Sequence, residues 1–245
     1  MKKKSLVLGL AVVVAGFMAL GAPGVAKADT LLTGPFLTGT FNFNIYTGTG
    51  VTNSAVFGAP NNYTQSASFT YTGPLNFYNL NGQNYSNTFG EFFSTATTNE
   101  EGFETAIGNS ITVDGVASTS GDFETMVDTF LARTMSTATG LTSYISITGQ
   151  TWGATFTVHH DDGASLYNTN SSYTATTGTA FSDPQGWQVT SSGSLNSGPF
   201  ELDYVEYNGS PSELQVEATP EPTSLFLVVG VLLAWAVVYR KRLMA

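Results

Sequence analysis

The stretch HHDDG, residues 159–163, holds both histidines of the chain, followed by two adjacent aspartates and a glycine. It follows the alternating run TWGATFTV and precedes ASLY, a pattern that predicts a strand, a turn and a second strand. Carboxylates at a sharp turn, here Asp161 and Asp162, can aim at one point, and Ca²⁺ takes about six to eight hard oxygen ligands. The same residues suit a hairpin, in which Asp bonds to its own backbone and Gly163 takes a positive φ. Both interpretations stay open at this point.

The two histidines offer a second kind of site. Adjacent strand residues face opposite ways, so we expect His159 and His160 not to bind one ion together. One histidine with Asp161 or Asp162 leaves a transition-metal site as an alternative, although no ligand spacing supports it. Trp152, Trp187 and the tyrosines near the turn can either stack on sugar rings or lie in the core.

Catalysis has little support in the sequence. Cysteine is absent and no Gly-x-Ser-x-Gly motif occurs, so no nucleophile is identified. Paired carboxylates for glycoside hydrolysis are recognised by their separation in space, which a sequence does not give. We therefore expect a protein that is not an enzyme.

The N-terminus is typical of a cleavable secretory signal. Lysines at positions 2–4 precede a long apolar run that closes with small residues, Ala26 and Ala28, at the cleavage motif. We expect residues 1–28 to be removed and the mature chain to begin at Asp29. An uncleaved membrane anchor is the alternative.

The C-terminus carries a second apolar segment. Leu225 to Tyr239 are uncharged and are followed by the basic residues RKR at 240–242. As a helix this run spans only about 22 Å, a short membrane segment that needs snorkelling flanks or local thinning of the bilayer. The basic cluster places the C-terminus on the cytoplasmic side.

The tripeptide Pro220-Glu221-Pro222, the short apolar segment and the basic end occur in that order, and residues 219–245 therefore resemble the PEP-CTERM sorting signal of Gram-negative bacteria. The resemblance implies recognition by an exosortase, an inner-membrane intermediate, and delivery to the cell surface or to the exopolysaccharide matrix. An ordinary single-span tail anchor has the same apolar length and charge, and only the tripeptide separates the two.

Between the two ends the chain is strongly acidic. The region 29–219 holds 17 acidic residues and one basic residue, Arg133, which gives a formal charge of −16. Such a field repels nucleic acid and anionic lipid and concentrates cations, so divalent ions and neutral sugars are favoured as partners. The same charge also serves solubility. About 190 residues suffice for one self-supporting core without disulfides.

Within 29–218 the apolar residues alternate in runs such as GTFNFNIYTG, GLTSYISITG and GATFTVHH, bounded by Gly, Asn and Ser. This pattern predicts an all-β antiparallel sandwich. One segment departs from it: apolar residues at helical spacing follow a Ser120 or Asp122 cap, and they predict one inserted helix over about 122–135. We expect its apolar stripe to pack on the sandwich. The preceding FFSTATTNEEGFETAIGN is interpreted as a loop.

The order of these strands is similar to that of PA14-like domains. SYISITGQTWGATFTVHHDDGASLY is followed some thirty residues later by SGPFELDYVEYNGSPSELQV, and YTQSASFTYTGPLNF fits the opening strands. The resemblance implies a β-sandwich that in lectin-like members holds Ca²⁺ through two neighbouring aspartates, the ion then coordinating sugar hydroxyls. Carried over by position, the ligands are Asp161, Asp162 and Glu206. The insertion at about 89–140 and His159-His160 depart from the family pattern.

Two classes of function follow from the sequence. The first is a Ca²⁺-assisted carbohydrate-binding module in an extracellular polysaccharide or biofilm matrix. The second is a structural matrix or adhesion protein without a small-ligand site. The sequence does not identify the sugar or the oligomeric state.

Overall fold

The computed structural model describes residues 36–49, 55, 62–79, 86–97, 100–137, 140–169, 179–183, 189–207, 209, 212–220 and 235. The chain divides into two compact units, Met1–Thr30 and Leu31–Ala245, and all the described residues belong to the second. The expected signal peptide, Trp187 and nearly all of the expected sorting signal lie outside the described residues. No helix in the described part is long and apolar enough to cross a membrane.

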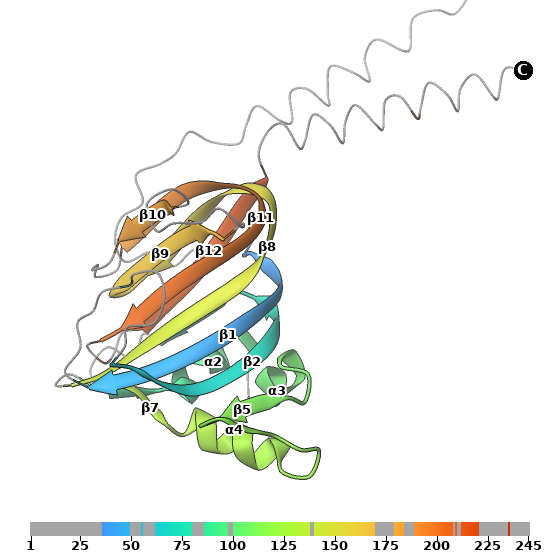
Figure 1. The fold of residues 1–245 in the computed structure, drawn as a ribbon, viewed down its shortest axis with the longest axis vertical. Helices are drawn as coiled ribbons and strands as arrows, with labels where there is room; N and C mark the ends of the chain where they lie inside the picture. Colours follow the sequence, from blue (N-terminus) through green and yellow to red (C-terminus); the bar gives the residue numbers. More distant parts are fainter. Residues whose placement is uncertain are drawn as a thin grey trace, which may run out of the picture. The chain divides into compact units, whose positions relative to one another are not determined.

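The second unit is built from antiparallel strands with a few short helices (Figure 1), which confirms the predicted fold class. The strands are β1 (Thr38–Thr49), β2 (Thr64–Pro74), β3 (Asn76–Asn79), β4 (Ser86–Thr88), β5 (Ile111–Val113), β6 (Val116–Ala117), β7 (Thr134–Thr137), β8 (Leu141–His160), β9 (Gly163–Asn168), β10 (Thr179–Asp183), β11 (Val189–Glu206) and β12 (Ser212–Pro220). The helices are α2 (Phe89–Thr97), α3 (Glu100–Ala106) and α4 (Phe123–Leu131).

The organising element is the long antiparallel ribbon of β8 and β11, which pair along almost their whole lengths. The first half of β8 also pairs with β1, and its second half pairs with β12. Since β11 occupies the other edge of β8, β1 and β12 share one edge and must separate midway along it. One layer therefore follows the order β10-β9-β11-β8-β1-β2-β5-β6, and the other continues from the far halves of β8 and β11 into β12 and β3.

The core between the layers is rich in aromatic rings. Phe43 of β1 lies 5.8 Å, centroid to centroid, from Phe77 of β3, in an edge-on contact. Tyr71 of β2 lies 5.4 Å from the same Phe77. Edge-to-face pairs at this distance add about 0.5–1.5 kcal/mol beyond burial of their area. Because strands from both layers contribute to one buried cluster, the two layers form a sandwich.

The prediction of a loop before the inserted helix was wrong, because that segment forms α2 and α3. Phe89, Phe92 and Phe93 recur at helical spacing and are buried, and Phe103 of α3 is buried as well. The start of α2 is a capping box: Thr88 N–H donates to Glu91 Oε2 at 2.8 Å, and Glu91 N–H donates to Thr88 Oγ1 at 3.2 Å. The insertion therefore adds rings to the core, and Figure 1 shows its helices gathered near β2 and β5.

The predicted helix near 122–135 is confirmed as α4, although it ends at Leu131 and the chain has entered β7 by Thr134. Asp122 occupies the N-cap position without a side-chain cap bond, since its Oδ1 accepts from Thr119 N–H instead. The expected apolar stripe is buried on the sandwich, and Phe130 stacks 4.8 Å from Phe89 of α2.

A second, smaller apolar cluster lies on the outer face of the larger layer. Tyr144 alternates with the core residues Ile145 and Ile147 and so points away from the main core. It is nevertheless fully buried, together with Ala55 and Val205. The outer face is therefore covered at this point, and polar side chains beside Tyr144 are removed from water.

The ribbon bends where β1 and β12 part. In β8 the side chains of the main apolar core are odd-numbered before the bend, as at Ile147, and even-numbered after it, as at Phe156. Gly149 and Gly153 lie at the change of face, and Gly153 has a φ of 88°. A Cβ built on Gly149 would lie 2.9 Å from Phe41 Cδ1 and 3.0 Å from Phe200 Cε1, so the two rings fill the space of a side chain.

This contact gives a stability prediction. Gly149→Ala should lower the free energy of unfolding by about 1–3 kcal/mol, because the added methyl group overpacks the rings of Phe41 and Phe200. Gly140→Ala is the matched control, since a Cβ there meets nothing within 4 Å. Urea denaturation of both variants measures the difference. Equal stability of the two would show that the bend does not depend on the missing side chain.

Candidate functional site

The Asp161-Asp162 turn connects the two layers. β8 ends at His160 and β9 begins at Gly163, but β9 pairs with β10 and β11 and not with β8. The hairpin interpretation was therefore wrong, because β11 lies between the strands that the turn joins. The positive φ belongs to Asp162, at 62°, and not to Gly163. Asp tolerates this conformation better than most residues, and Asp161 Oδ1 accepts from Asp162 N–H at 2.8 Å.

Glu206 reaches the same end of the sandwich from β11. Its side chain is fully buried on the core face, like Leu202 and Tyr204 of the same strand. The Tyr204 hydroxyl donates to Glu206 Oε2 at 2.6 Å and accepts from Glu213 N–H at 3.2 Å. Ser136 Oγ lies 3.2 Å from Glu206 Oε1 and accepts from Gly209 N–H at 3.1 Å. These bonds tie β7, β11 and β12 together around one carboxylate.

The three predicted ligands share one electrostatic environment. Asp161 and Asp162 are also buried, at 3% and 2% exposure. Burial raises the pKa of Glu206 well above its ordinary value, and the charge of Asp162 and then that of Asp161 raise it further, against the hydroxyls of Tyr204 and Ser136. The structure thus brings together the carboxylates that the sequence resemblance had named. We call them the end cluster.

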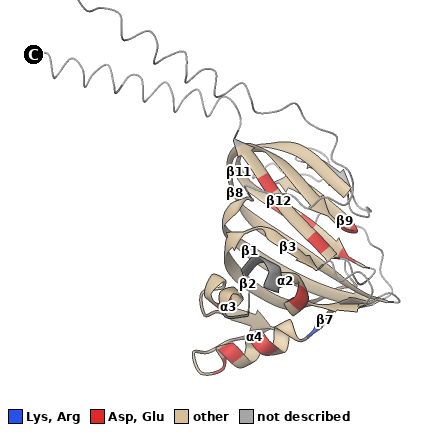
Figure 2. Ribbon diagram, turned by 180° about the vertical axis from the view of Figure 1, so that it is seen from behind, with Lys and Arg blue, Asp and Glu red and all other residues tan. Residues whose placement is uncertain are grey.

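No cationic side chain in the described part compensates the end cluster. Figure 2 shows acidic positions on α4 and on the strands around β12, and basic colouring beside β7. The basic residue there is Arg133, and its guanidinium donates to both carboxylate oxygens of Asp114 at 2.8 and 2.7 Å. Within 36–220 the buried acids are therefore neutral by protonation or are matched by a cation from solution.

The end cluster fits Ca²⁺ in the kind of its donor atoms, which are all hard oxygens. These oxygens are, however, turned toward other partners. Asp162 Oδ2 accepts from Tyr207 N–H at 2.5 Å, and the oxygens of Glu206 face Tyr204 and Ser136. In the described ranges no three or more His, Asp and Glu side chains are arranged to hold a metal ion. An ion here would require at least one of these carboxylates to turn from its present partner.

The two histidines have separate partners, as expected for opposite faces. His160 Nδ1 lies 3.2 Å from the Asp162 carbonyl oxygen, and its Nε2 lies 3.0 Å from Ser191 Oγ. His159 Nε2 lies 3.4 Å from Glu213 Oε2. Burial lowers the pKa of His159 and raises the pKa of Glu213 to about 7. In both groups burial therefore disfavours the charged form.

A groove of about 400 Å³ lies at the bend of the ribbon, where β1 and β12 part. Its lining includes hydroxyl and amide side chains from β1 and β8, namely Thr38, Thr40, Gln150 and Thr151, beside the apolar Leu37 and Phe41. None of the described residues that line it is charged. We call it the corner groove.

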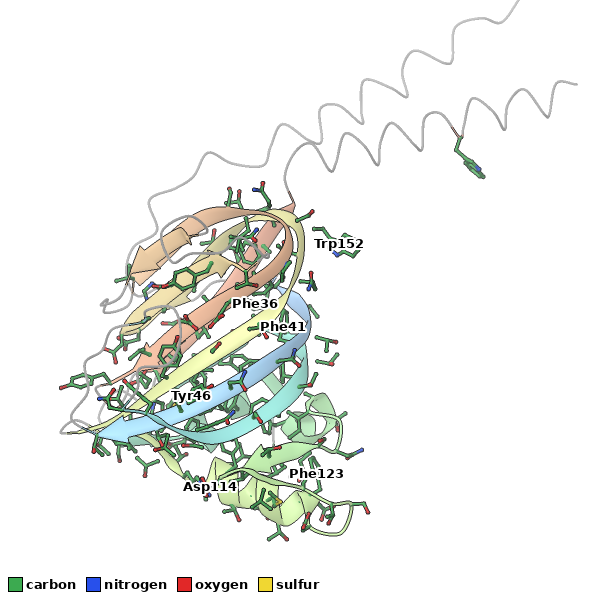
Figure 3. All side chains as sticks on the ribbon, in the orientation of Figure 1. Phe36, Phe41, Tyr46, Asp114, Phe123 and Trp152 are labelled. Atoms are coloured by element: carbon green, nitrogen blue, oxygen red, sulfur yellow. The ribbon has the colours of Figure 1, made fainter. Side chains whose placement is uncertain are left out.

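Trp152 stands at the rim of the corner groove with 90% of its surface exposed. Figure 3 shows its indole pointing away from the strands. A tryptophan is among the largest apolar side chains, and near-complete exposure gives up the stabilisation that burial would bring.

Trp152 and Asp161 are nine residues apart on extended β8, so the groove and the end cluster lie about 30 Å apart along the strand.

The three acids and Trp152 were identified as candidates from the sequence, but the residues that surround Glu206 were missed. Tyr204, Ser136 and Asn87 form the hydrogen-bonded surroundings of Glu206, and they come from segments far apart in the chain. The alternation of Tyr204 and Glu206 was the one available signal, because residues two apart on a strand share a face.

Comparison with known proteins finds two related solved structures. One is the PA14 domain of the MpAFP antifreeze protein, with 17% identity and a TM-score of 0.38, covering 80% of this chain and 89% of that one. The other is the PA14 sugar-binding domain from an RTX adhesin, with 16% identity and a TM-score of 0.38, covering 75% of this chain and 90% of that one. No protein-family model matches the chain, and no curated protein matches it. Because the identities and TM-scores are this low, the function of the site is inferred from the contacts within this chain.

Proposed function

We propose that this protein is an exported cell-surface or matrix protein whose sandwich binds a neutral extracellular polysaccharide at the corner groove, with Ca²⁺ held at the end cluster. It performs no catalysis. The observation that carries the proposal is the exposed indole of Trp152 beside a groove lined without charge. An indole face packs on the C–H face of a sugar ring, while hydroxyl and amide side chains such as Thr40 and Gln150 exchange hydrogen bonds with its hydroxyls.

The charge of the domain supports a neutral polymer. Between residues 29 and 219 the formal charge is −16, so an anionic polymer would be repelled at long range. Among the described residues that line the groove, none is a basic side chain that could bind an anionic sugar. Recognition there depends on stacking and on neutral hydrogen bonds, which salt screens little.

The proposed role of Ca²⁺ differs from direct coordination of the sugar. Asp161, Asp162 and Glu206 are at most 3% exposed, which leaves a bound ion no open side for sugar hydroxyls. The ion would instead neutralise three buried carboxylates that come from the turn and from β11. It would thereby hold together the two ends of the ribbon, because Asp161 follows His160 at one end and Glu206 lies opposite Ser143 at the other.

Export and sorting form the remaining part of the proposal. β12 runs to Pro220, the first residue of the Pro-Glu-Pro tripeptide, and Pro220 pairs with Ala154 at the rim of the corner groove. Cleavage by an exosortase near the tripeptide would therefore leave β12 and the groove intact. The membrane-embedded intermediate and its basic cytoplasmic end rest on the sequence of residues 221–245 alone.

The corner groove is tested by Trp152→Ala. The free energy of unfolding should stay within about 0.5 kcal/mol of the parent, because the side chain is exposed. Affinity for a neutral polysaccharide should fall at least about tenfold, since a stacking anchor is removed. Val116→Ala, an exposed apolar residue at 63% on the β5–β6 hairpin, is the control and should bind like the parent. Affinity electrophoresis in neutral and in anionic polysaccharide measures both. Unchanged mobility of Trp152→Ala would leave the purely structural matrix protein as the better description.

The end cluster is tested by replacing Asp161 and Asp162 together with Asn, which keeps the turn chemistry and removes two charges. Millimolar Ca²⁺ added after EDTA should stabilise the parent by about 2.7 kcal/mol for each site filled at one hundred times its Kd. The double variant should gain clearly less, as thermal melting of the purified full chain would show. An equal gain in parent and variant would place the ion elsewhere.

The sorting signal is tested by expressing the protein in Gram-negative cells that have an exosortase. Replacing Pro220, Glu221 and Pro222 with Ala should abolish the shorter surface form and leave the precursor in the inner membrane. Fractionation followed by immunoblotting detects both forms. A surface form of normal size and amount in this variant would contradict exosortase sorting.

A further inference from the structure

We propose that the outer face of the larger layer holds a second divalent-cation site, formed by Asp203 and Glu201 of β11 and taking Ca²⁺. This site is separate from the end cluster, because Asp203 and Glu206 differ by an odd number of residues on one strand and so face opposite sides of the sheet. It does not depend on the sugar-binding proposal.

The register of three neighbouring strands places Asp203 between two hydroxyl groups. Asp203 lies opposite Ser146 of β8 on one side and opposite Ser165 of β9 on the other. Directly opposed residues of neighbouring strands share a face, with Cβ atoms about 4.5–5.5 Å apart. The core face is occupied at this level by Leu202, which lies opposite Ile147 and Leu166. The three polar residues therefore form a row on the outer face.

Asp203 is fully buried, and neither of its carboxylate oxygens has a hydrogen-bond partner in the described part of the chain. The hydroxyls of Tyr144 and Ser146 lie near enough to lower its pKa and the carboxyl group of Glu201 near enough to raise it, but none of the three meets hydrogen-bond geometry with it. Nearly all buried polar side chains in folded proteins have a partner, and an orphaned carboxylate is among the most costly exceptions. Such a group calls for a ligand that the protein itself does not supply.

A second carboxylate adjoins the first. Glu201 lies two residues before Asp203 on the same face, and its Oε1 accepts from Ser146 Oγ at 2.9 Å. The same Ser146 lies directly opposite Asp203, so the two carboxyl groups share one patch of the outer face, and the charge of Glu201 adds to burial in raising the pKa of Asp203. Arg133, the basic side chain of the described part, is bound to Asp114 and does not serve this pair.

The surrounding donors are all oxygens. They are the two oxygens of Asp203, one of Glu201, the hydroxyls of Ser146 and Ser165, and the carbonyl of Ala55, to which Ser165 Oγ donates at 2.6 Å. Two carboxylates with hydroxyls and a carbonyl make a set that suits Ca²⁺, which accepts irregular geometry. Mg²⁺ demands near-ideal octahedral geometry and retains several waters, so a covered site of this kind disfavours it.

The test is metal binding to the full chain after EDTA has been removed by exchange. Isothermal titration with CaCl₂ counts the sites. Tb³⁺ luminescence excited through tyrosine reports an ion at the outer site through Tyr144 and Tyr167, which lie on the face of Asp203. Tyr204 can sensitise an ion at the end cluster in the same way, so the signal is assigned from the variants. The variant with both Asp161 and Asp162 replaced by Asn should keep one Ca²⁺ equivalent and the tyrosine-sensitised signal. Asp203→Asn should lose that equivalent, while Glu201→Gln should weaken it at least about tenfold.

The variants separate this site from the end cluster. Should Asp203→Asn fail to fold, Glu201→Gln at the partly exposed end of the pair carries the test alone. If Asp203→Asn and Glu201→Gln both bind Ca²⁺ like the parent, the outer site is excluded, whatever the end cluster does. If the double Asp variant loses all binding, or if the parent binds no Ca²⁺, Asp203 is a protonated carboxylic acid of the covered face and the proposal is wrong.

Discussion

The bend of the β8–β11 ribbon at Gly149 and Gly153 is the constraint on which the rest of the structure depends. The two strands are long enough to belong to both layers, so the bend determines how the layers face each other. At the bend, Phe41 and Phe200 close over Gly149, and β1 and β12 separate along the shared edge of β8. The corner groove lies in that separation. The Asp161-Asp162 turn follows one end of the ribbon and Glu206 lies at its other end, so the same ribbon positions both candidate sites.

A shortage of cationic side chains is the second constraint. Arg133 is committed to Asp114, while Glu206, Asp203 and Glu213 are buried carboxyl groups with pKa values raised by burial. Most domains pair such groups with Lys or Arg, but residues 36–220 of this chain contain no basic residue besides Arg133. The remaining means are protonation and ions from outside.

The sandwich could be predicted because its strands alternate strictly. Runs such as Phe41, Phe43 and Ile45 show which side chains share a face, and one face of each strand is the core. Alternation does not show whether the other face is covered, which is why the burial of Tyr144 and Asp203 was not foreseen. The helices α2 and α3 were missed because polar Thr and Glu dominate the segment. The spacing of Phe89, Phe92 and Phe93 and the Thr88–Glu91 capping box were the available signals.

The candidate site was predictable in part. The Asp-Asp-Gly motif and the Tyr-x-Glu element named Asp161, Asp162 and Glu206, and the fold brings them together. The arrangement of the strands on either side of the turn was not predictable from local sequence. β11 lies between β8 and β9 in the sheet, so the turn that joins β8 to β9 is not a hairpin. Hairpin chemistry is local, whereas pairing with a strand some forty residues away is a property of the whole sheet. The exposure of Trp152 likewise depends on the bend and not on its neighbours in sequence.

The proposed binding depends on a neutral sugar ring that stacks on Trp152 at the corner groove. It is tested most directly by two-dimensional NMR of the ¹⁵N-labelled chain during titration with neutral oligosaccharides. The three tryptophans of the chain give three separate indole N–H signals, which substitution assigns. Saturable movement of the Trp152 signal, with the signals of Trp187 and Trp235 stationary, is the predicted result. A Trp152 signal that stays in place while the oligosaccharide binds, or no binding by any neutral sugar, would contradict the account.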